Sequence, residues 1–71
     1  MSAAKIALKH VEAALAEARA EGADADATAR YMLGAIVHKY LEYRSLEDVR
    51  AELRFVAENC DPDADYMFMR P

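Results

Sequence analysis

Few side chains in this sequence could do chemistry, and the histidines are the first candidates. His10 and His38 fall in two segments expected to form antiparallel helices, at positions expected to lie level with each other. With Glu42, one helical turn from His38, they could supply three metal ligands. Single histidines on a helix surface usually have no such role, so we predict no metal site and no cofactor.

Cys60 and the acids that follow it are the other candidates. Cys60 falls on an apolar stripe, where a cysteine is usually a small buried side chain rather than a reactive thiol. Asp61, Asp63 and Asp65 are spaced like the start of a calcium loop, but Tyr66 stands where that loop needs glycine. The chain also has no glycine-rich phosphate loop, no G-x-S-x-G and no H-E-x-x-H, so we predict that it is not an enzyme.

Start and stop signals divide the 71 residues into helical blocks. Ser2 can cap the first helix, and Gly22 suits a left-handed helix end. Asp24 or Asp26 can cap the second helix, and Ser45 opens the third as in a capping box. We predict one all-α domain over 1–71, an antiparallel three-helix bundle with a short C-terminal helical turn. The expected helices are about 3–21, 27–43 and 46–59, with the turn at about 62–67.

Apolar residues recur at three- and four-residue spacing in each block, which is the period of an amphipathic helix. The main stripes hold Leu8, Val11 and Leu15, then Met32, Leu33, Ile36 and Tyr40, then Leu46, Val49, Leu53 and Val56. Hydrophobic residues make up 55% of the chain, but sixteen of them are alanines, which bury little area. A domain this small usually needs a disulfide, a metal, very regular packing or a partner chain. We therefore expect a homo-oligomer, in the simplest case a dimer.

The charges of the first helix oppose the helix dipole. Lys5 and Lys9 lie at its positive end, and Glu17 and Glu21 lie at its negative end. Each pair is also a like-charge i,i+4 pair, which lowers helix stability slightly. Two interpretations stay open: chance on a solvated face, or electrostatic matching to an antiparallel neighbour.

A secondary stripe on each of the first two helices follows i, i+4, i+7, i+11 spacing. Ala13 and Ala35, at the centres of the two stripes, would permit close approach of another helix. The stripes either flank the contact between the two helices or form a surface where another helix docks, and bundle handedness decides whether they share a face. We predict partner binding by Ile6, His10, Ala13, Glu17, Tyr31, Ala35, His38 and Glu42.

The expected function is that of a small acidic interaction protein, which binds a protein partner and modulates it. The whole net charge of −4 lies after Arg44, which argues against a nucleic-acid partner. One alternative is a phage- or plasmid-type inhibitor whose acidic C-terminal half mimics nucleic acid or blocks a basic groove. Its surface would be Glu47, Asp48, Glu52, Asp61 and Asp63. A second alternative is a helix-turn-helix-like transcription regulator, which the negative third helix disfavours.

The cellular location follows from two further observations. No apolar run approaches the roughly 18 residues of a membrane span. A lone thiol suits a reducing compartment. We expect a cytoplasmic protein with no membrane partner.

Overall fold

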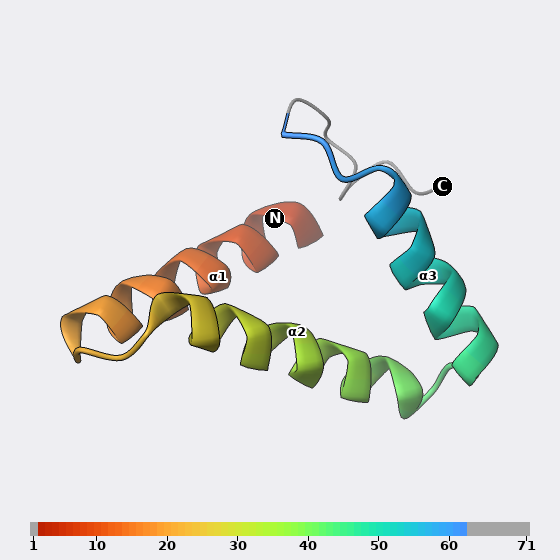
Figure 1. Ribbon diagram of the computed structural model, residues 1–71, viewed down its shortest axis with the longest axis horizontal. Coiled ribbons are helices and arrows are strands. Elements are labelled where there is room, and N and C mark those ends of the chain that lie inside the picture. Colours follow the sequence, from red (N-terminus) through yellow and green to blue (C-terminus); the bar gives the residue numbers. More distant parts are fainter. Residues whose placement is uncertain (1, 63–71) are drawn as a thin grey trace. The chain divides into compact units, whose positions relative to one another are not determined.

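The computed structural model describes residues 2–62, which form three α-helices: α1 (Ala3–Ala20), α2 (Ala25–Leu41) and α3 (Leu46–Glu58) (Figure 1). Residues 2–62 contain no strand, so the predicted all-α fold with three helices is confirmed. The predicted C-terminal turn lies, from residue 63 on, outside the described residues. The helices fall into two compact units that divide between Ile36 and Val37, and each unit is described by itself. The single domain and the antiparallel bundle packing stay predictions.

The first helix has the ends that its sequence predicts. The Ser2 hydroxyl oxygen accepts a hydrogen bond from the Lys5 amide at 3.2 Å, which caps the N-terminus of α1. At the other end, Gly22 adopts a φ of +76°, the left-handed region that glycine enters without strain. The Ala23 amide donates to the Ala18 carbonyl at 2.8 Å, which completes a Schellman motif.

The second helix spans Ala25–Leu41, so it begins and ends two residues before the expected bounds of 27 and 43. Asp24 is the capping residue, because its carboxylate accepts a hydrogen bond from the Asp26 amide at 3.0 Å. The Thr28 amide and hydroxyl both donate to the Asp24 carbonyl at 2.9 Å. Asp26, the other candidate cap, lies in the first turn and pairs with Arg30 at 2.6 Å.

The third helix begins at Leu46 as predicted and ends at Glu58, one residue before the expected end. The Ser45 hydroxyl oxygen accepts a hydrogen bond from the Asp48 amide at 3.1 Å, so Ser45 is its N-cap. Asn59 is its C-cap, and the Asn59 side-chain amide donates to the Phe55 carbonyl at 2.8 Å. Cys60 lies beyond this helix end and is exposed, so the prediction of a buried cysteine is wrong.

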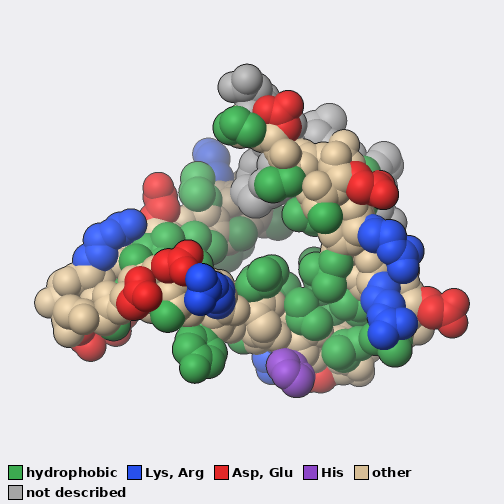
Figure 2. Space-filling view, viewed as in Figure 1, with side chains coloured by type: hydrophobic (Ala, Val, Ile, Leu, Met, Phe, Trp, Pro, Cys, Tyr) green, Lys and Arg blue, Asp and Glu red, His purple; other side chains and the backbone are tan. Residues whose placement is uncertain are grey.

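Very little of the described chain is buried. Ala18 in the first unit is 7% exposed and Val49 in the second is 2% exposed, and these are the two buried apolar side chains among residues 2–62. Leu15, Met32 and Tyr40 are half-buried. Most other large members of the predicted stripes are exposed, and hydrophobic side chains reach the surface of both units (Figure 2).

Candidate protein-binding surface

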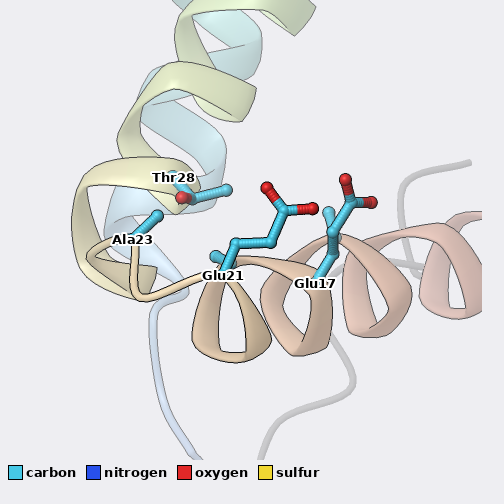
Figure 3. A pocket seen from close by; sticks show the side chains of 6 residues that line it. Glu17, Glu21, Ala23 and Thr28 are labelled. Atoms are coloured by element: carbon cyan, nitrogen blue, oxygen red, sulfur yellow. The ribbon is translucent and has the colours of Figure 1, made fainter.

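A shallow groove opens between the end of α1 and the start of α2, within the first unit. Its volume is about 280 Å³. Figure 3 shows Glu17 and Glu21 on consecutive turns of α1, with Ala23 in the connecting turn and Thr28 on α2. The Gly22 turn and the Asp24 cap bring these elements together. The lining residues are Ala14, Glu17, Ala18, Glu21, Ala23 and Thr28.

The chemistry of this groove is that of a hydrogen-bond acceptor. Glu17 and Glu21 are exposed, and no ion pair joins either carboxylate to a cation among residues 2–62. The Thr28 hydroxyl donates its hydrogen bond to the Asp24 carbonyl. The two carboxylates of the groove can therefore accept hydrogen bonds from cationic or amide groups of another molecule.

The α1 part of the predicted partner surface is open to solvent. All four of its α1 members are exposed, and the Ile6 side chain is 46% exposed. These residues are Ile6, His10, Ala13 and Glu17. A second hollow on α1, about 440 Å³ in volume, has Lys5, Ile6, Lys9 and His10 among its walls.

On α2, Tyr31 and Ala35 are also exposed, and the Tyr31 side chain is 81% exposed. Tyr31 lies one turn beyond Thr28 along α2. Tyr31 itself lines a separate hollow with Ala27 and Arg30, whereas Glu17 lines the groove, so a shared face for the two secondary stripes stays a prediction. His38 and Glu42 belong to the second unit, so the complete eight-residue surface stays a prediction.

Neither histidine is part of a metal site that the structure describes. His10 lies in the first unit and His38 in the second, and both are exposed. Across the part of the chain that the structure describes, no three His, Cys, Asp or Glu side chains come together as metal ligands. Glu42, the third candidate ligand, pairs instead with Lys39 at 3.5 Å.

The second unit contains a polar cluster that the sequence analysis missed. The Arg44 guanidinium lies 2.6 Å from the Asp48 carboxylate and 3.4 Å from the Glu52 carboxylate. It also stacks over the Tyr40 ring, 4.7 Å from the ring centre, and Tyr40 meets Tyr43 edge-on. The Arg44 side chain is only 20% exposed. The hydrogen bond to Asp48 raises the pKa of Arg44 above its ordinary value, because it favours the charged guanidinium.

This cluster also bears on the alternative acidic surface. Asp48 and Glu52 point their carboxylates at Arg44, and the Glu52 side chain is only 18% exposed. Of the other three predicted residues, Glu47 lies in the first turn of α3, Asp61 follows that helix, and Asp63 is outside the described residues. Part of the negative charge proposed for an outside partner is therefore matched within the chain itself.

Comparison with known proteins adds no further assignment. No protein-family model, curated protein or solved structure matches this chain. Within residues 2–62, no helix has both the length and the apolar character needed to cross a bilayer.

Proposed function

We propose that this chain acts by binding another protein, which it modulates, and that it carries no catalysis of its own. One observation supports the proposal above all. Eleven large apolar side chains are exposed among residues 2–62, whereas only Ala18 and Val49 are buried. Exposed apolar clusters on a small protein are typical of sites that a partner covers. The proposed setting is the cytoplasm.

The proposed contact surface is made by five exposed residues of the first unit: Ile6, Ala13, Glu17, Tyr31 and Ala35. Ile6 and Tyr31 would supply the apolar and aromatic anchors that dominate binding energy at protein interfaces. The small side chains of Ala13 and Ala35 leave room for the backbone of a docking helix. The Glu17 carboxylate would accept a hydrogen bond from a lysine or arginine at the rim.

The acidic-inhibitor and DNA-reading alternatives have less support. Both use α3, where Arg44 already neutralises part of the charge of Asp48 and Glu52. A DNA reader would also present a net negative helix to the phosphate backbone, which costs affinity. Strong salt sensitivity of a complex, lost on neutralising Glu47 and Asp61, would favour the inhibitor over the proposed function.

The test is affinity capture from the native host with tagged full-length chain. We expect wild-type chain to capture a defined protein other than itself, and Ala13→Arg or Ala35→Arg to reduce that capture at least tenfold. Both alanines are exposed helical residues, so the substitutions should leave folding intact. Ala51→Arg is the matched control, because Ala51 is an exposed alanine on α3 outside the proposed surface.

Two results would count against the proposal. Equal capture by wild type and both surface variants would reject this surface. Capture of no protein by wild-type chain, with circular dichroism confirming the helices, would reject protein binding as the function.

A further inference from the structure

We propose that the exposed face of α1 pairs antiparallel with α1 of a second copy of this chain, with Ala13 at the two-fold axis. The inference names the occupant of the α1 part of the proposed surface and in that respect rests on the proposed function. The observation behind it is that the charged residues at the two ends of α1 have no ion-pair partner among the described residues.

Within the first unit, α1 borders the start of α2 at the groove, and the charged residues of that part of α2 do not match those of α1. Arg30 and Asp26, the charged residues of α2 within the first unit, pair with each other. None of the four charges at the ends of α1 has an ion-pair partner among residues 2–62. These charges are Lys5, Lys9, Glu17 and Glu21. The order of charges in α1, which disfavours the isolated helix, is therefore not explained by contacts within the unit.

A second α1 in antiparallel orientation supplies the missing match. Lys9 lies four residues before Ala13, and Glu17 lies four residues after it. With Ala13 at the two-fold axis, Lys9 of one copy therefore lies level with Glu17 of the other copy. Lys5 and Glu21 lie eight residues before and after Ala13, and the same symmetry applies to them. A two-fold interface needs such self-complementarity, because one surface must serve on both copies. In a parallel pair, the lysines would face lysines.

The side chains between these charges permit a close helix contact. Ile6, Ala13 and Ala20 follow one another at seven-residue spacing, so they lie along one face of α1. All three are exposed. Ala18, which is buried in the unit, lies five residues from Ala13 and hence about 140° away around the helix. The pairing would thus leave the α1–α2 contact intact and place Ile6 against Ala20 of the second copy.

The pairing is expected to be weak and concentration-dependent. One helix of 18 residues offers a small interface, of the kind found in transient complexes. Sedimentation equilibrium of the full chain from about 5 to about 500 µM should show the mass rising from one chain towards two. Lys5→Glu/Lys9→Glu and, separately, Glu17→Lys/Glu21→Lys should each weaken this association at least tenfold.

Mixing the two double variants provides the decisive measurement. Each variant repels itself, but all four facing positions carry opposite charges in a mixed pair, so an equimolar mixture should regain the doubled mass. Both double variants also place charges in the order that the helix dipole favours, so a lost dimer is not explained by an unfolded α1. Arg30→Glu/Lys39→Glu is the control: it changes the net charge as much as the lysine variant and should associate like wild type.

Three results would overturn this pairing. They are a wild-type chain that stays monomeric throughout, charge variants that associate as well as wild type, and a mixture that stays monomeric. A monomeric chain that still captures another protein through Ala13 and Ala35 would overturn the dimer alone. A dimer that responds to the charge variants as expected but captures no other protein would overturn only the proposed binding of a separate partner.

Discussion

The two units of this chain hold their helices together in different ways. In the first unit, the buried side chain is Ala18, and the charges of α1 make no ion pair with α2 among the described residues. In the second unit, Val49 is almost fully buried, and Arg44 joins the end of α2 to two carboxylates of α3. The end charges of α1 in the first unit thus stay unpaired within the described residues, whereas Arg44 of the second unit pairs with carboxylates of α3.

This difference bears on which unit contributes more to the free energy of unfolding and which unit is the better candidate for partner binding. A buried valine contributes more apolar burial than a buried alanine, and the Arg44 cluster fixes the connection between two helices. The first unit has neither feature, and its outer face carries both exposed apolar side chains and unmatched charge. We therefore expect the second unit to contribute most of the folding stability, and the first unit to carry the proposed partner contact.

The largest effect should come from Val49→Ala. Removing two buried methyl groups from the second unit should lower the free energy of unfolding by about 2 kcal/mol. Urea unfolding followed by circular dichroism measures this loss. Leu46→Ala is the control, since Leu46 is 52% exposed on the same helix and should cost much less. Equal losses for both variants would mean that the second unit has no distinct core at Val49.

The two glycines of the first unit should respond in opposite directions. Gly22 has a φ of +76°, so Gly22→Ala forces a side chain into the left-handed region and should cost about 1 kcal/mol. Gly34 lies inside α2, where alanine is the better helix former, and Gly34→Ala should stabilise by up to about 1 kcal/mol. No described atom lies within 4 Å of the Cβ that either substitution would add. Urea midpoints that shift in the same direction for both would contradict this account.

The smallest effect should come from Arg44→Gln, which removes the ion pairs of the second unit. We expect a lower urea midpoint, with a loss smaller than that of Gly22→Ala. Because the pKa of Arg44 is raised in the folded chain, its contribution is fully present below the unfolded pKa and is lost only as the pH rises through the folded pKa. The difference between wild type and variant should therefore stay constant from about pH 7 to about pH 10. A difference that disappears within this range would show that Arg44 does not contribute through its charge.

Much of the helical structure was predictable because its signals are local. Ser2, Gly22 and Ser45 each act on backbone groups within a few residues, and the three- and four-residue apolar period is typical of a helix. The expected start of α2 lies two residues too late, because Asp24 and Asp26 are both suitable capping residues. Choosing between them required the backbone geometry.

The burial and the Arg44 cluster were harder to predict. Burial depends on which helices meet, and apolar periodicity alone does not say how much of a stripe a neighbour covers. The cluster did have a signal, because Tyr40, Arg44, Asp48 and Glu52 recur at four-residue spacing. That spacing crosses the boundary between two predicted helices, so the sequence alone does not indicate that these four residues share one helix face. The partner surface stays a prediction, because a binding partner leaves no local signal in the sequence.

The most direct test of the central claim is the urea midpoint of the wild-type chain at two protein concentrations, about 5 and about 500 µM. If the exposed apolar side chains are covered by association, folding and binding are linked, and the midpoint should rise with concentration. A urea midpoint that is high and identical at both concentrations, from a chain that sediments as a monomer, would contradict the claim that association covers these side chains and stabilises the fold.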